Sequence, residues 1–258
     1  TEEGAGSDPR AMTTSATLSD DGSHYVINGE KLWCTNGTKA DLIILMAVTA
    51  PKVVRGKERK QITAFIVEMN TPGVEIVHRC RFMGLKALYN GVIRFTDVKI
   101  PKENMVLGEG DGLRLALQTL NTGRLSIPAA CTGNSKWCMK VIRKWSNERV
   151  QWGHPIGEHE TIAGKQAKIA SDTFAMDAVW KLASSMADNK HFDIRLEAAV
   201  AKLFNTEANY AILQETLQIR GGRGFETADS LKARGQEAIP IERALRDSRV
   251  NLIFEGST

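Results

Sequence analysis

Short apolar runs rich in β-branched and aromatic residues recur through the first hundred residues. The predicted strands are 13–18, 24–27, 42–48, 62–67 and 92–100. Turn residues separate them, such as Ser19-Asp20-Asp21-Gly22, and the Lys/Arg-rich stretch 52–60 is predicted to be a loop. Because no helical pattern lies between these runs, they favour an antiparallel barrel or sandwich.

After Gly112 the apolar positions recur every three or four residues instead. One stripe comprises Ala163, Ala167, Ala170, Phe174, Ala178, Leu182 and Met186, and a second comprises Leu196, Ala199, Leu203, Tyr210, Leu213 and Leu217. The stripes predict two helices of about 25 residues each. The short spacer 188–191 is typical of a connection in an up-down bundle. The sequence therefore predicts an α+β multidomain fold, with a β domain over 1–111 and a helical bundle over 112–258.

Composition narrows the class of protein. The chain has 258 residues, of which 42% are hydrophobic and 25% charged, as in soluble globular proteins. No run approaches the roughly 20 apolar residues that cross a bilayer, so no membrane span is expected. The net charge of +4, without a basic helix, argues against nucleic acid as a partner. The four cysteines form no C-x-x-C pair, so we expect reduced thiols and no metal site.

One carboxylate near the end of the chain lies in an apolar context. Ile253 and Phe254 precede Glu255, and Gly256 follows it. Burial by the two apolar neighbours would raise the pKa of Glu255, which suits a general base for a weakly acidic C–H proton. A Glu-Gly pair is equally typical of a helix C-cap, so the pattern alone leaves both interpretations open.

Three glycine-containing strings also allow more than one interpretation. Trp33 and Thr35 could flank and hydrogen-bond a flat heterocycle, although a tryptophan on a strand is usually a core residue. Residues 218–224 could bring bare backbone close to a phosphate, or simply cap a helix. Residues 108–112 lack the spacing of a dinucleotide-binding loop and are interpreted as a hinge.

Five ordered strings together resemble the acyl-CoA dehydrogenase family over the whole chain. Residues 1–8, 33–37, 148–153 and 218–222 are similar to that family's T-E-P-x-x-G-S-D, W-I-T-N-G, E-R-x-x-F-G and Q-x-x-G-G. Arg246-Asp247 with Phe254-Glu255-Gly256 resembles its R-D…[YF]-E-G. Each string alone is weak, but five of them in the same order at similar spacing are specific.

The resemblance implies a flavoenzyme of fatty acid β-oxidation that converts acyl-CoA to trans-2-enoyl-CoA. Glu255 would remove the α-proton, while the β-hydrogen leaves as hydride to N5 of FAD. Contacts with FAD are expected from Thr1, Ser7, Trp33, Thr35, Arg149, Gln151, Trp152, Gln218, Gly221, Gly222 and Ser257. Contacts with the acyl-CoA substrate are expected from Ser7, Thr49, Asn121, Arg124 and Gly256.

The resemblance also implies partners. A homodimer or homotetramer is expected, because each FAD site would draw on two chains, and an electron-transfer flavoprotein is the expected electron acceptor. Residues 120–124 are most similar to the L-N-N-G-R of the long- and very-long-chain branch, and Gly123 would widen the pocket for a long acyl chain. The family's N-terminal helical domain is absent from this chain, so both ends are expected to be cut from something longer.

The expected location is the bacterial cytoplasm or the mitochondrial matrix. Two alternative functions stay open at this point: an acyl-CoA oxidase of the same superfamily, and a non-catalytic homologue that serves as an assembly or scaffold partner.

Overall fold

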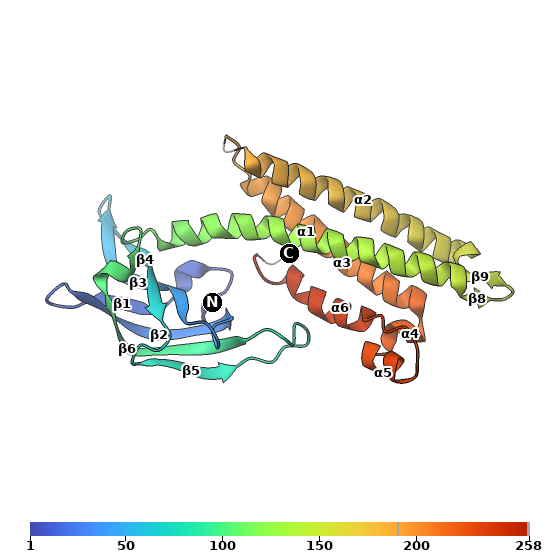
Figure 1. Ribbon diagram of the computed structural model, residues 1–258. Coiled ribbons are helices and arrows are strands. Elements are labelled where there is room, and N and C mark those ends of the chain that lie inside the picture. The colour runs from blue at the N-terminus through green and yellow to red at the C-terminus, as the bar shows by residue number, and fades with distance from the viewer. Residues whose placement is uncertain (190, 257–258) are drawn as a thin grey trace. The chain divides into compact units, whose positions relative to one another are not determined.

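A computed structural model describes residues 1–189 and 191–256 of the chain. It contains two compact units, Thr1–Thr119 and Leu120–Thr258 (Figure 1). The expected combination of a β-sheet domain followed by a helical domain is confirmed. The first long helix, α1 (Gly112–Glu148), begins where the sequence predicted the helical half, and the two units divide within it.

The first unit is built on one seven-stranded sheet. Its strands are β1 (Ser15–Leu18), β2 (His24–Thr35), β3 (Leu42–Val54), β4 (Lys57–Glu68), β5 (Val74–Arg79), β6 (Asn90–Pro101) and β7 (Met105–Val106). Their order across the sheet is β5-β6-β2-β1-β3-β4-β7. Every pairing is antiparallel except that of β1 with β3, where Ser15 lies opposite Val48. Ile27, Phe65 and Ile93 are among the fully buried residues of its core. Burial of such side chains is the main term that stabilises the sheet.

The predicted loop at 52–60 is wrong, because β3 and β4 continue through it as a hairpin. Their register runs to the pair Val54 and Lys57. Arg55 and Gly56 form the turn with φ of 52° and 72°, and two positive φ angles are typical of a tight hairpin turn. Basic side chains are compatible with a strand whose side chains face solvent, so their abundance does not indicate a loop. The edge strand β5 was not predicted, because it is exposed along most of its length and lacks an apolar alternation.

The second unit contains three long helices and several short elements. The long helices are α1, α2 (Glu160–Asp188) and α3 (Arg195–Arg220), and the short ones are α4 (Gly222–Phe225), α5 (Ala228–Ala233) and α6 (Ile241–Ser248). A two-stranded ribbon, β8 (Val150–Gln151) with β9 (His154–Pro155), follows α1. Single turns of 3₁₀ helix occur at Pro9–Ala11, Lys102–Asn104, Ile156–Glu158 and Arg249–Leu252. Cys138, Met176 and Leu213 lie in the core of this unit. None of the helices that the structure describes could cross a membrane.

The two predicted helices form, but much of each predicted apolar stripe points outward. Phe174 and Leu182 of α2 are 79% and 63% exposed, and Leu196 of α3 is 72% exposed. The buried face of α3 is instead partly polar and includes Asn205 and Thr216. The Thr216 hydroxyl donates to the Ile212 carbonyl, and Asn205 donates to Thr132 and to the Met176 carbonyl. Such internal hydrogen bonds remove most of the cost of burying polar groups.

Candidate functional site

Glu255 lies just beyond the last 3₁₀ turn, in a backbone conformation that strongly favours glycine. Its φ is 57°, and that of Gly256 is 100°. A non-glycine residue at positive φ is uncommon and marks a local constraint. The Glu255 carboxylate approaches α1 where Gly123 has no side chain: a Cβ there would lie 3.4 Å from Oε2. Gly123 therefore leaves a notch in α1 beside the carboxylate.

The Glu255 residue is partly buried, and one of its carboxylate oxygens is shielded from solvent. Oε2 is buried and accepts no hydrogen bond from the residues that the structure describes. Burial raises the pKa of Glu255 above its ordinary value, and the positive charges of Arg124 and Lys202 oppose that rise. The carboxylate thus has one buried acceptor oxygen, Oε2, to which no group in the described part of the chain donates.

The source of this burial differs from the sequence prediction. Ile253 and Phe254 are themselves exposed, at 55% and 41%. The carboxylate instead lies against α1 at Gly123.

Two positively charged side chains donate hydrogen bonds to the backbone carbonyls of the Glu255 turn. The Arg124 Nε–H donates to the Glu255 carbonyl at 3.0 Å, and the Lys202 ammonium donates to the Gly256 carbonyl at 2.5 Å. Lys202 is only 3% exposed, and burial lowers its pKa. Hydrogen bonds from charged donors are stronger than neutral ones, so this pair can stabilise the strained turn. Arg124 is one of the expected substrate contacts, whereas Lys202 is not among the expected site residues. Its apolar neighbours on the helix did not indicate a functional role.

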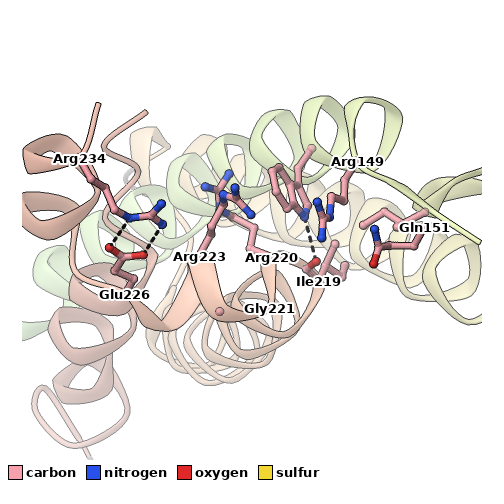
Figure 2. Close-up of a pocket in the computed structure, with 11 residues that line it drawn as sticks. Arg149, Gln151, Ile219, Arg220, Gly221, Arg223, Glu226 and Arg234 are labelled. Carbon is pink, nitrogen blue, oxygen red and sulfur yellow. Dashed lines mark hydrogen bonds and ion pairs between the residues drawn. The ribbon is translucent and has the colours of Figure 1, made fainter. Parts of the chain in front are cut away.

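A second site, which we call the arginine cavity, has a volume of about 500 Å³ and lies at the end of α1 and α3 (Figure 2). Four of the residues expected to contact FAD line it: Arg149, Gln151, Gly221 and Gly222. Gly221 has φ of 57° and ends α3, so the helix-cap interpretation is confirmed. Both glycines also face open space, because a Cβ on either would meet no atom within 4 Å.

The main charges of this cavity were not among the expected site residues. Arg220, Arg223, Arg234 and Glu226 also line it, together with Trp145. Arg234 and Glu226 form a two-point ion pair, with N–O distances of 2.9 and 2.6 Å. The basic residues on both sides of Gly221-Gly222 were the available signal.

Two residues of the same expected FAD group do not line the cavity. Trp152 is almost fully exposed and stacks edge-on against His159, with ring centroids 5.5 Å apart. Gln218 is exposed on the last turn of α3. Ser257 lies outside the described residues.

The expected site residues of the first unit fall into an exposed and a buried group. Thr1, Ser7 and Trp33 are exposed, and Trp33 has φ of 57°, so the interpretation of Trp33 as core is wrong. The Thr35 hydroxyl accepts from the Asn90 amide at 3.1 Å. Thr49 is buried, and its hydroxyl is 2.9 Å from that of Thr63. Its interior position gives no support to the expected contact with CoA.

Asn121 belongs to α1 and is half-buried, two residues before Gly123. With Arg124 it places two of the expected substrate residues on the stretch of α1 that Glu255 approaches.

Comparison with known proteins identifies the family. The family model "Acyl-CoA dehydrogenase, middle domain" matches residues 1–98, and "Acyl-CoA dehydrogenase, C-terminal domain" matches residues 110–258. The chain therefore belongs to the acyl-CoA dehydrogenase family, whose members are FAD-dependent oxidoreductases, as the five sequence strings predicted.

Three relatives illustrate the match. A probable acyl-CoA dehydrogenase, FadE10, of Mycobacterium tuberculosis is 51% identical over 259 residues, covering 100% of this chain and 39% of the relative. The mitochondrial very long-chain specific acyl-CoA dehydrogenase of Macaca fascicularis is 35% identical over 261 residues, covering 100% of this chain and 38% of the relative. The structure of butyryl-CoA dehydrogenase from Megasphaera elsdenii matches with a TM-score of 0.87 and 32% identity, covering 100% of this chain and 63% of that one. The chain thus spans well under half the length of these two curated relatives.

Proposed function

We propose that this chain supplies the middle and C-terminal parts of an FAD-dependent dehydrogenase that oxidises acyl-CoA thioesters to trans-2-enoyl-CoA, with Glu255 as the base. The observation that carries this proposal is the Glu255 carboxylate itself. Its Oε2 is buried and receives no hydrogen bond from the described part of the chain, and burial raises the pKa of Glu255. A free, poorly hydrated carboxylate oxygen is what removal of a carbon-bound proton requires.

The raised pKa helps the proposed proton transfer. The α-proton of a thioester is a weak acid, so a base whose pKa lies closer to that of the proton transfers it more readily. The positive charges of Arg124 and Lys202 would limit that rise in the pKa of Glu255. Both cations would also fix the turn through its carbonyls, and thereby the direction of the carboxylate.

Charge that develops on the thioester oxygen also needs a donor. In the proposed arrangement the backbone N–H of Glu255 is that donor, because it belongs to the same turn as the base. Gly256, with no side chain, would let the acyl chain pass close to this turn. Asn121, Arg124 and Ser7 are proposed to contact the substrate, while the buried position of Thr49 does not favour it.

The residues of the arginine cavity fit an adenine dinucleotide. Arg149 offers a guanidinium, and Gly221 and Gly222 offer open backbone, which suits a pyrophosphate. Thr1, Ser7, Trp33 and Thr35 are proposed for the flavin end, with exposed Trp33 as a stacking surface. When bound, FAD would supply the hydride acceptor. Gln151, Trp152, Gln218 and Ser257 remain proposed FAD contacts.

Partners and chain length follow from the same proposal. The notch at Gly123 would leave room for a long acyl chain beside Glu255. A homodimer or homotetramer is proposed, since FAD would contact two chains, with an electron-transfer flavoprotein as acceptor.

The proposal is tested with the full-length, FAD-loaded protein under anaerobic conditions. Palmitoyl-CoA should bleach the flavin absorbance of the wild-type protein and of Glu58→Gln, a control at the exposed β3–β4 hairpin. Glu255→Gln should retain FAD and lose bleaching. Bleaching at the wild-type rate by Glu255→Gln would refute the assigned base.

A further inference from the structure

The arginine cavity carries more positive charge than the residues expected to bind FAD account for. Of its four arginines, Arg234 is neutralised by Glu226 through the two-point ion pair in Figure 2. Arg149, Arg220 and Arg223 have no ion pair with a carboxylate among the described contacts. The cavity therefore retains three guanidinium charges facing about 500 Å³ of open space.

Arg220 is the most unusual of these three. The residue is 6% exposed, and its buried Nε–H has no hydrogen-bond acceptor among residues 1–189 and 191–256. Burial lowers its pKa, an effect that the charge of Glu237 opposes. Glu237, however, already pairs with the Lys144 ammonium at 2.8 Å. A buried charge without its own counter-charge is costly, and an anion bound beside Arg220 would offset that cost.

All three guanidinium groups lie close to the ring of Trp145. Their central carbons lie 5.0 Å (Arg220), 5.2 Å (Arg223) and 6.0 Å (Arg149) from the centre of the Trp145 ring. The indole N–H donates to the Ile219 carbonyl at 3.1 Å, which fixes the ring (Figure 2). Cation–π attraction offsets only part of the repulsion among three like charges so close together. The arrangement thus favours a ligand group with more than one negative charge.

We propose that Arg220 and Arg223 join Arg149 above Trp145 to bind a diphosphate group, and that Arg220 makes this cavity select a diphosphate over a monophosphate. The proposal rests on the proposed function, in which the diphosphate is that of an adenine dinucleotide. Guanidinium groups bind phosphate oxygens with two parallel hydrogen bonds, so three of them match the several oxygens of a diphosphate. Gly221 and Gly222 leave the approach open, since neither position would bring a Cβ within 4 Å of another atom.

The test uses the full-length protein, stripped of flavin, with ADP and AMP as separate probes in isothermal titration calorimetry. The wild-type protein should bind ADP more tightly than AMP. Arg220→Met should weaken ADP by roughly 10–100-fold, the range expected for losing a hydrogen bond to a charged group, and should nearly abolish the preference over AMP. Arg223→Met should weaken ADP in the same direction. Arg143→Met, an exposed arginine on the same helix as Trp145, is the matched control and should match the wild type.

A second readout separates ligand binding from a structural role. Removing an uncompensated buried charge should leave the melting temperature of the flavin-free protein unchanged or raise it. If Arg220→Met instead lowers that temperature by several degrees, or if both variants keep the wild-type ratio of ADP to AMP affinity, the proposal is wrong. Neither result involves acyl-CoA, so failure here is distinguishable from failure of Glu255 as the base.

Discussion

The notch in α1 beside Glu255 leads to a prediction about Gly123. Gly123 is a helical residue, and an alanine Cβ there would lie 3.4 Å from Oε2 and 3.7 Å from Cδ of Glu255, which is ordinary contact. Replacing an interior helix glycine by alanine stabilises a helix by about 0.5–1 kcal/mol. Gly123→Ala should therefore raise the melting temperature by roughly 1–4 °C. It should also reduce turnover, because the new methyl group occupies space next to the base.

Gly123→Val extends the same argument. The Cβ of an alanine would already be in contact with Glu255, and valine adds two γ-carbons to that Cβ. The Glu255 turn or the valine side chain must therefore shift. Overpacking of this kind costs about 1–3 kcal/mol. If the overpacking displaces the Glu255 carboxylate from its reactive position, kcat/KM for a long-chain acyl-CoA should drop by roughly 5–150-fold.

The control lies on the same helix. A Cβ on Gly133 of α1 would meet nothing within 4 Å, so Gly133→Ala should give the same helix stabilisation without touching Glu255. Steady-state kinetics with palmitoyl-CoA and thermal melts of the three variants make the comparison. Wild-type kcat/KM in Gly123→Val would refute the claim that this notch adjoins the acting carboxylate.

Two further predictions concern charge. Lys202→Met removes a positive charge that holds down the pKa of Glu255, so the acidic limb of the pH profile of kcat/KM should move to higher pH; an unmoved limb would contradict that electrostatic role. In the first unit, burial would raise the pKa of Glu2, but hydrogen bonds from Lys31, Thr13 and Thr14 outweigh it and lower the pKa to about 2. Since the folded pKa lies below the ordinary value of 4.5, this stabilisation is present above pH 4.5 and is lost as pH falls towards 2. Glu2→Gln should thus lower the melting temperature at pH 7 with a penalty that shrinks towards pH 2, and a penalty independent of pH would contradict the assignment.

Much of the fold was predictable because it depends on local patterns. The five predicted strands and two predicted long helices all form, since β-branched runs and three- to four-residue periods report directly on backbone conformation. The outward-facing stripes on α2 and α3 were not predictable in the same way. Phe174 and Leu196 look like core residues by hydrophobicity, while Asn205 is buried through hydrogen bonds that only the folded structure supplies.

Residues of the candidate site were predictable from the sequence only where they belong to a motif of adjacent residues. Glu255, Arg149, Gly221 and Gly222 were predicted from motifs that resemble a known family, and the last three line the arginine cavity. Arg220 belongs to one of those motifs. The motif did not indicate, however, that Arg220 is buried next to Trp145, which belongs to a different helix. Contacts between distant segments, such as the one between Lys202 and Gly256, have no signature in a single sequence.

The most direct test of Glu255 as the base is exchange of the substrate's own α-proton. Palmitoyl-CoA is incubated anaerobically in D₂O with the full-length, FAD-loaded protein, and deuterium at its C2 is measured by mass spectrometry. The wild-type protein and Glu58→Gln should incorporate deuterium into unreacted substrate, whereas Glu255→Gln should not. Equal incorporation by Glu255→Gln would show that another group takes the proton.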